Sequence, residues 1–291
     1  VARHVTSAAS EVLLILNDED GEFDYALARV DTEITVQNAG VGGFRVGDLT
    51  RPVDDFILGF LAHLALAPYG EVNGDIPFSQ VEHALSLNPT LIVSFDTFGN
   101  DLIAAVVLGS RPELDNITDE EIFLEDVQEL MRQLGHSDAQ VFLSNSPRPG
   151  LLPAARALVA GSDDPEATQA LIDEADAICD RYNGILAEQA EGYDNVHIVD
   201  GHGFAEDLLE SGLSAGGQEL DIYRFGGLLS LDGVHFTDTG YAAFAQLFAE
   251  AISDELGVSV GPIDLDEVVE QDLRSPLALA EAGLDLEACQ R

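Results

Sequence analysis

The stretch LIVSFDTFGND (91–101) begins with an apolar run and ends in polar residues. An apolar run without strict alternation is typical of a strand that is buried on both faces of a parallel sheet. Two similar runs, AQVFLSN (139–145) and NVHIVD (195–200), follow it at intervals. Between them lie two amphipathic stretches, TDEEIFLEDVQELMRQLG (118–135) and a longer one from about Pro165 to Ala190. This alternation of strands and helices predicts an α/β fold.

The pattern extends in both directions from this centre. Upstream, VLLIL (12–16) and EITVQN (33–38) are expected to be strands, followed by a helix from about Asp48 to Leu66. Downstream, a helix is expected from about Thr239, with Tyr241, Phe244, Phe248 and Ile252 on one face. For the helix over 118–135, Thr118 is the expected N-cap and Gly135 the expected end.

These elements predict a three-layer α/β/α sandwich of the flavodoxin-like kind, with a parallel sheet of about five strands. Residues 1–256 are expected to form this domain. Residues 257–291 are expected to form an acidic C-terminal extension that packs one or two short helices on the domain.

The charge of the chain is extreme, with 54 acidic residues, 12 basic residues, all of them arginine, and a formal net charge of −42. Self-repulsion of this size opposes compaction and is relieved when salt screens the charges. Because the acids are spread over the whole sequence, we expect a protein adapted to high salt. An acidic face that binds a partner is the alternative. Nucleic acid and anionic membranes are not expected partners, because both require a basic surface.

Other features of the composition indicate which structural class of protein this is. Hydrophobic residues make up 46% of the chain, which is typical of a globular protein. Two cysteines are too few for a disulfide framework or a zinc ligand set. The sequence contains no apolar run long enough for a transmembrane helix.

Three polar or glycine-rich segments lie at or near predicted strand ends: NAGVGG (38–43), DTFGND (96–101) and LDGVHF (231–236). In open parallel sheets, ligands bind at the carboxyl ends of the strands. Within the last segment, Asp232 and His235 are close enough for the carboxylate to accept a hydrogen bond from one ring nitrogen. The alternative is structural: Asp232 forms a turn with Gly233, and His235 packs against the start of a helix.

The segment LDGVHFTDTGYAAFAQLFAEAI (231–252) resembles the last conserved block of the SGNH/GDSL hydrolase (esterase/lipase) family, D-G-x-H-P-[ST]-x-x-G-Y. NAGVGGFRVGDL (38–49) resembles the second block, and FGND (98–101) resembles the third, G-x-N-D. VFLSNSPRPGLLP (141–153) is similar to the segment after the fourth strand in esterase members. The resemblance implies the SGNH fold and hydrolysis of a carboxylic ester through an acyl-enzyme intermediate, without a metal or an organic cofactor.

The resemblance also assigns roles to residues. Asp232 and His235 would be the acid and base of a Ser-His-Asp triad. The backbone N–H of Gly43 and the side-chain amide of Asn100 would donate to the oxyanion of the tetrahedral intermediate. As alternatives, Gly43 would serve a tight loop that needs a positive φ, and Asn100 would cap a helix.

Two residues depart from the family pattern, and one block is missing. Phe98 stands where the third block has glycine, and Phe236 where the last block has proline. The nucleophile block, G-D-S, does not occur in the 291 residues. We expect the nucleophile upstream of Val1, in a natural protein that is longer than this chain. The other possibility is a non-catalytic binding or scaffold protein on the same fold.

Some residues support weaker alternatives. His197, Asp200 and His202, together with Asp232 and His235, form a conceivable cluster for a metal-dependent hydrolase. Arg45, Arg148 and Arg224 could each hold an anionic substrate group, although ion pairs are the simpler use.

The sequence leaves the ester substrate open. Tyr223, Phe225 and Leu228 could line an acyl pocket, although core packing is the default for such residues. The substrate could be a short-chain acyl ester, a lipid or an acetylated sugar. A periplasmic or extracellular location is favoured by the resemblance.

Overall fold

The computed structural model describes residues 12–17, 24–29, 39–53, 58, 62, 65–66, 78–107 and 112–286. The chain divides into two compact units, and each is described by itself. Unit 1 comprises residues 1–92 and 123–140, and unit 2 comprises residues 93–122 and 141–291. None of the helices in the described ranges has both the length and the apolarity that a membrane span requires.

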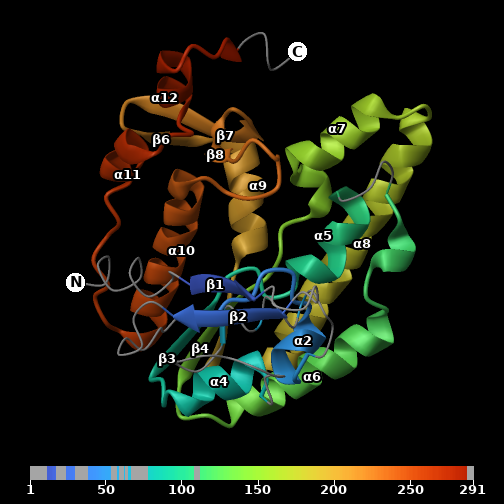
Figure 1. The fold of residues 1–291 in the computed structure, drawn as a ribbon, viewed down its shortest axis with the longest axis vertical. Helices are drawn as coiled ribbons and strands as arrows, with labels where there is room; N and C mark the ends of the chain where they lie inside the picture. Colours follow the sequence, from blue (N-terminus) through green and yellow to red (C-terminus); the bar gives the residue numbers. More distant parts are fainter. Residues whose placement is uncertain are drawn as a thin grey trace. The chain divides into compact units, whose positions relative to one another are not determined.

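Unit 1 contains an antiparallel pair of strands, β1 (Val12–Asn17) and β2 (Asp24–Arg29). The strand expected over 12–16 therefore exists, but it belongs to a separate two-stranded sheet and not to the parallel sheet (Figure 1). The reason is the short spacing: a brief connection can join only antiparallel neighbours, since a parallel pair needs a crossover of about a dozen residues or more. The strand expected over 33–38 lies outside the described residues.

The helices of unit 1 start from local signals. In α4 (Gln80–Ser86), Ser79 and Glu82 form a capping box: the Ser79 hydroxyl accepts the Glu82 N–H at 3.1 Å, and the Glu82 carboxylate accepts the Ser79 N–H at 2.7 Å. α2 covers Val46–Thr50. The single helix expected over 48–66 is wrong, because α2 ends at Thr50 and Arg51, which precedes Pro52, is extended with φ −136° and ψ 152°. Residues 58, 62, 65 and 66 are again helical.

The expected cap of the helix over 118–135 is wrong. α6 begins two positions later and spans Glu120–Gly135. The Thr118 hydroxyl donates to the carboxylate of Asp101 at 2.6 Å instead, and its carbonyl accepts the hydroxyl of Tyr182. The Asp119 carboxylate accepts the N–H of Glu121 at 2.9 Å, which satisfies one of the open donors of the first turn. Thr118 therefore bonds to Asp101 and Tyr182 and does not act as the N-cap that the local pattern predicts.

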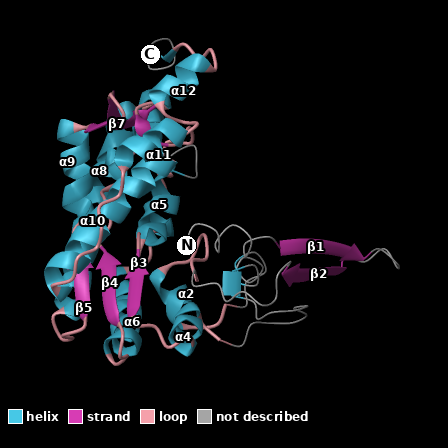
Figure 2. Cartoon of the chain, turned by 90° about the vertical axis from the view of Figure 1, so that its left-hand side faces the viewer, coloured by secondary structure: helices cyan, strands magenta, loops and turns pink. Residues whose placement is uncertain are grey.

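Unit 2 contains most of a three-stranded parallel sheet in the order β3-β4-β5, formed by Leu91–Ser94, Gln140–Ser144 and Val196–Val199. Figure 2 shows the three arrows pointing the same way. β4 is buried from Val141 onward, as the apolar run predicts. β3 is not buried on both faces: Leu91 and Val93 are 41% and 48% exposed. The physical reason is position, because β3 is an outer strand of the described sheet and β4 is the central one.

The longer helices of unit 2 are α5 (Gly99–Val107), α7 (Pro153–Gly161), α8 (Pro165–Ala190), α9 (Gly201–Ser211) and α10 (Asp238–Leu256). The helix expected over 165–190 is confirmed. Thr237 is the N-cap of α10, and its hydroxyl accepts the N–H of Gly240 at 3.0 Å. It buries Phe244, Phe248 and Ile252, as the spacing predicts, while Tyr241 stays 44% exposed.

A second sheet and the C-terminal segment complete unit 2. The sheet has the order β6-β7-β8, formed by Leu213–Ala215, Gln218–Arg224 and Gly227–Leu229. Beyond it, α11 (Leu265–Gln271) and α12 (Pro276–Glu281) are the short helices expected after residue 257. They are part of the core, because Val269 is fully buried and the buried carboxylate of Asp272 accepts the N–H and hydroxyl of Thr239 at 2.9 and 2.7 Å.

Candidate active site around His235

The loop between β8 and α10 is a closed turn that carries both Asp232 and His235. The N–H of Ser230 donates to the carbonyl of His235 at 2.7 Å, and Leu229 pairs with Phe236 in an antiparallel bridge. Gly233 lies at the tip with φ +73°, a conformation that favours glycine. The glycine of LDGVHF therefore lets the chain fold back on itself and sets the two polar side chains beside each other.

Four hydrogen bonds hold the carboxylate of Asp232. One oxygen accepts from the Nδ1 of His235 at 2.7 Å. The other accepts from the Ser230 hydroxyl at 2.8 Å and from the N–H groups of Val234 and His235 at 2.9 and 3.0 Å. Partial burial acts to raise the pKa of Asp232, but these hydrogen bonds outweigh it and hold the pKa well below its ordinary value. Asp232 is therefore ionised at neutral pH, and Nδ1 of His235 carries a proton.

The structure thus brings Asp232 and His235 together, as their spacing predicts, and the ring is not walled off. The side chain of His235 is 71% exposed. With Nδ1 committed to the carboxylate, Nε2 is the ring nitrogen that can accept a proton. This is the arrangement of a general base whose tautomer is fixed by an acid, and the catalytic role itself stays a prediction.

His235 lines a cavity of about 100 Å³ in unit 2. Besides His235, its polar lining residues include Asp96, Asn100 and Ser146. Its other walls are apolar and come from α5, the segment after β4, α9, β7, β8 and α10. Asn100 is the second residue of α5, so the predicted amide donor lies at the same cavity as the predicted base.

Asp96 is the cavity residue that sequence reasoning missed. It lies two residues after the end of β3 and has φ +54°, which is uncommon for a residue other than glycine and is better tolerated by aspartate than by most. Its carboxylate accepts the N–H of Gly99 and lies 3.5 Å from the hydroxyl of Ser146. A Cβ on Gly99 would meet an Asp96 oxygen at 2.0 Å, so a side chain at that position would displace the Asp96 carboxylate. The signal for Asp96 in the sequence was the polar run DTFGND (96–101) after the strand over 91–94.

Burial raises the pKa of Asp96, against the opposing effects of the Gly99 N–H, the Ser146 hydroxyl and the charge of His235. Burial likewise raises the pKa of Tyr241, and the negative charges of Asp96 and Asp232 act in the same direction. The pKa of Asp96, which lines the cavity, and the pKa of Asp232, which holds His235, are therefore shifted in opposite directions, as is characteristic of sites that divide acid and base roles.

The two residues that depart from the family pattern pack against other aromatic rings. Phe98 is completely buried and meets the ring of Tyr182 edge-on, with centroids 6.3 Å apart. Phe236 packs edge-on against Phe95 at 5.9 Å and against Tyr241 at 5.7 Å. Phe98 and Phe236 are therefore both held by aromatic packing. Phe98 does not line the cavity that contains Asn100.

Gly43, the other predicted oxyanion donor, belongs to unit 1. It has φ +85°, and a Cβ there would approach Leu58 at 3.3 Å. The alternative reading, a tight loop that needs positive φ, fits this conformation. Its role as an oxyanion donor stays a prediction.

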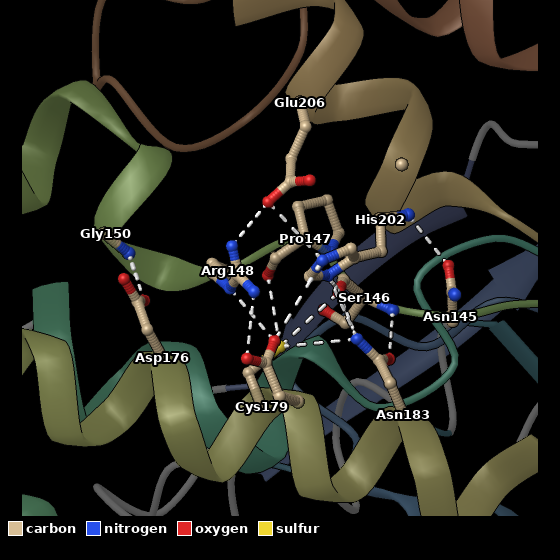
Figure 3. Close-up of polar contacts among 12 residues, drawn as sticks. Asn145, Ser146, Pro147, Arg148, Gly150, Asp176, Cys179, Asn183, His202 and Glu206 are labelled. Carbon is tan, nitrogen blue, oxygen red and sulfur yellow. Dashed lines mark hydrogen bonds and ion pairs between the residues drawn. The ribbon is translucent and has the colours of Figure 1, made fainter.

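The loop after β4 forms one wall of the cavity, and side chains fix it from two helices (Figure 3). Asn183 of α8 accepts the N–H of Ser146 and donates to the carbonyl of Ser146, both at 2.9 Å. Asn145 donates to Asp200 at 3.1 Å and accepts the N–H of His202 at 2.8 Å. These pairs hold Ser146 in place through its backbone.

Arg148, in the same loop, is an ion-pair residue. It donates twice to Asp180, at 2.9 Å each, and once to Glu206 at 2.5 Å (Figure 3). This is the simpler of the two uses considered for the arginines. Arg148 adds a link between α8 and α9 across the loop.

The alternative metal cluster is not assembled in the described part of the chain, where no group of three or more His, Cys, Asp or Glu side chains is arranged to hold an ion. His197 packs its ring on Phe142 with centroids 4.7 Å apart and faces Glu255. Asp200 accepts the N–H of Gly203 at 2.9 Å as the cap of α9. His202 contacts the carbonyl of Ser146 through Nδ1 at 3.2 Å.

Two of the residues considered for an acyl pocket, Tyr223 and Leu228, do not line the cavity. Leu228 is fully buried in the core, and Tyr223 is 44% exposed, with Arg156 placed 4.9 Å above its ring. Ile222 and Leu229 line the cavity instead, because side chains alternate along strands and the register differs by one position.

No protein-family model matches the sequence, and no curated protein or solved structure is significantly similar to it.

Proposed function

We propose that the protein is a serine-dependent carboxylic ester hydrolase of the SGNH/GDSL type, on a three-layer α/β/α fold, that works in high salt. The observation that carries the proposal is the pair of Asp232 and His235. A carboxylate with a lowered pKa holds Nδ1 of an exposed imidazole at 2.7 Å, at the rim of an apolar cavity. An oriented imidazole beside an apolar cavity is what acyl transfer from an uncharged ester needs.

In the proposed mechanism, Nε2 of His235 removes the proton of a serine hydroxyl, whose oxygen attacks the ester carbonyl. The carbonyl oxygen becomes an oxyanion, to which the Asn100 amide donates. Loss of one such donor costs about 3 kcal/mol of barrier. The imidazolium then protonates the leaving alcohol, and the acyl-serine forms. Water attacks the acyl-serine in the second half-reaction, with His235 again taking and returning the proton.

The proposal assigns the role of nucleophile to none of the serines that the structure describes. Ser146 is the serine that lines the described cavity, but it is only 4% exposed and its hydroxyl faces the carboxyl of Asp96 at 3.5 Å. A hydroxyl in that position donates to a carboxylate and is not directed at an attacking path. We therefore assign Ser146 to the wall of the cavity.

The test uses the protein as its gene encodes it, in molar salt, with a nitrophenyl ester. His235→Ala should lower kcat by about 10³-fold or more, since the remaining groups supply only binding and oxyanion stabilisation. The matched control is His136→Ala, an exposed histidine at the end of α6. Ser146→Ala should cost less than about tenfold, as expected for a change in the wall of a binding site.

The outcomes separate the alternatives. Full activity in His235→Ala contradicts the site assignment. A loss in Ser146→Ala as complete as that in His235→Ala would move the nucleophile to Ser146. A protein without ester hydrolysis in any form would favour the non-catalytic binding or scaffold role.

A further inference from the structure

Ser230 is a polar residue of the turn around His235 to which the proposed mechanism gives no role. It follows β8 directly, and main-chain hydrogen bonds fix it on both sides. Its N–H donates to the carbonyl of His235 at 2.7 Å, and its carbonyl accepts the N–H of Gly233 at 2.9 Å. Its hydroxyl donates to the carboxylate of Asp232 at 2.8 Å. A serine hydroxyl has one proton to donate, and this proton is committed to Asp232.

The hydrogen bonds divide the two oxygens of the Asp232 carboxylate between two tasks. Oδ1 accepts from the Ser230 hydroxyl and from the N–H groups of Val234 and His235, at 2.8, 2.9 and 3.0 Å. Oδ2 accepts from Nδ1 of His235 at 2.7 Å. One oxygen is therefore bound to the turn, and the other faces the imidazole.

The three donors to Oδ1 differ in where they come from. The N–H groups of Val234 and His235 follow Asp232 in the chain and belong to the backbone of the turn. Ser230 precedes Asp232 and donates through its side chain. This third bond restrains the rotation of the carboxylate that the two N–H groups leave open. Because both oxygens belong to one rigid group, the direction of the bond from Oδ2 to Nδ1 depends on that rotation.

A water molecule in place of the Ser230 hydroxyl would satisfy Oδ1 without restraining it. The side chain of Asp232 is 50% exposed, so water can reach the carboxylate when the hydroxyl is removed. Such a water must itself be immobilised, which costs entropy. The Ser230 hydroxyl is already held by the main-chain bonds of its own residue. Water can therefore replace the hydrogen bond but not the restraint.

We propose that Ser230 is a positioning residue of the candidate active site, whose hydroxyl holds the Asp232 carboxylate so that the proton of His235 stays on Nδ1 and Nε2 is left as the base. Ser230 acts through Asp232 and not by contact with a substrate. The catalytic consequence rests on the proposed ester hydrolysis. The effect on the imidazole does not, because it is a property of the protein without substrate.

The first experiment determines the tautomer of His235 in the absence of a substrate. It uses the full chain labelled with ¹⁵N-histidine, in molar salt and under alkaline conditions in which an imidazole is neutral. The ¹⁵N shifts of the two ring nitrogens show which one carries the proton, and the signals of His235 are those missing in His235→Gln. Wild type should carry the proton on Nδ1. In Ser230→Ala, the ratio of the Nε2–H form to the Nδ1–H form should rise by about tenfold.

The variants are chosen so that the turn itself is preserved. Ser230→Ala leaves the main-chain bonds of the turn in place. Ser230→Thr retains the hydroxyl and should return the tautomer ratio toward that of wild type. The control is Ser86→Ala, which removes an exposed hydroxyl that donates to the carbonyl of His83 at 2.7 Å. A wild-type ratio in Ser230→Ala, or the same altered ratio in Ser230→Thr as in Ser230→Ala, would overturn the inference.

The second experiment measures the hydrolysis of nitrophenyl acetate by the same variants in molar salt. Ser230→Ala should lower kcat by about tenfold and leave KM within about twofold of wild type, because the change affects the base and not the binding of substrate. Ser230→Thr should recover most of the loss, and Ser86→Ala should retain the wild-type kcat. A wild-type kcat in Ser230→Ala, with or without a higher KM, would contradict a positioning role.

The two experiments fail separately. A changed tautomer ratio in Ser230→Ala, in a protein that hydrolyses no ester, would reject the proposed function and leave the effect of Ser230 on the imidazole standing. Hydrolysis by wild type, with neither the ratio nor kcat changed in Ser230→Ala, would reject the role of Ser230 and leave the proposed function standing.

Discussion

At the scale of single residues, the contact between Asp232 and His235 could be predicted from sequence because it is local. Their positions differ by three, and the intervening Gly233 allows the turn that joins them. Asp96 could not be predicted in the same way. Its role depends on its approach to Ser146, fifty positions away, and on burial that only the tertiary fold creates.

The raised pKa of Asp96 predicts how stability depends on pH. A carboxyl group whose pKa is higher in the folded state binds more protons there than in the unfolded state. Its contribution is therefore fully present below the ordinary pKa of 3.8 and is lost as the pH rises through the higher folded value. In Asp96→Asn this loss is absent, and the new side-chain oxygen can still accept the Gly99 N–H. The free energy of unfolding of Asp96→Asn relative to wild type should thus increase with pH.

Urea unfolding across this pH range, in molar salt, measures that difference. Asp207→Asn, an exposed carboxyl on α9, should give an offset that does not vary with pH. A difference for Asp96→Asn that is equally flat would mean that the Asp96 carboxyl is not desolvated in the folded protein.

At the scale of elements, the strongly periodic segments were predictable and their partners were not. The bounds of α8 and the buried face of α10 follow from periodicity alone. The strand over 12–16 was placed in the wrong sheet, and Thr118 was taken for a cap, because pairing and tertiary hydrogen bonds are not encoded within a short window. The register of β7 likewise decided which residues reach the cavity.

The loop after β4 depends on a clamp from α8. Asn183→Ala removes the partner of both the N–H and the carbonyl of Ser146. Backbone groups left without a partner in a partly buried position should lower the free energy of unfolding by about 1–3 kcal/mol. Urea unfolding in molar salt measures the change. Gln169→Ala, which removes an exposed contact to Asp173 on the same helix, should cost much less. Equal effects of the two substitutions would show that the clamp does not stabilise the loop.

At the scale of the whole molecule, the net charge determines how stability depends on salt. A net charge of −42 on 291 residues opposes the compact state, and the repulsion weakens as the Debye length falls. That length is about 10 Å at 0.1 M salt and about 3 Å at 1 M salt. The temperature of half-unfolding should therefore rise steadily from low to molar sodium chloride. A melting temperature that is the same at both ends of the range would contradict adaptation to high salt.

The α/β class and the sheet of unit 2 were predictable from the order of apolar runs, since each run is long enough to be a strand and each gap holds a helix. The division of the chain into two units was not predictable from the sequence. Residues 123–140 belong with the N-terminal part, and the segment after 257 belongs to the core of unit 2. Both facts depend on contacts between distant parts of the chain, which composition and periodicity do not report.

The central claim is that Asp232 acts through His235 as one catalytic unit, and a double-mutant cycle on ester hydrolysis tests it most directly. The four proteins are wild type, Asp232→Asn, His235→Ala and the double variant, compared by kcat in molar salt. Groups that act as a unit are non-additive, so the double variant should be no slower than His235→Ala alone. Losses that multiply, or an Asp232→Asn variant with full activity, would show that the two residues do not work together.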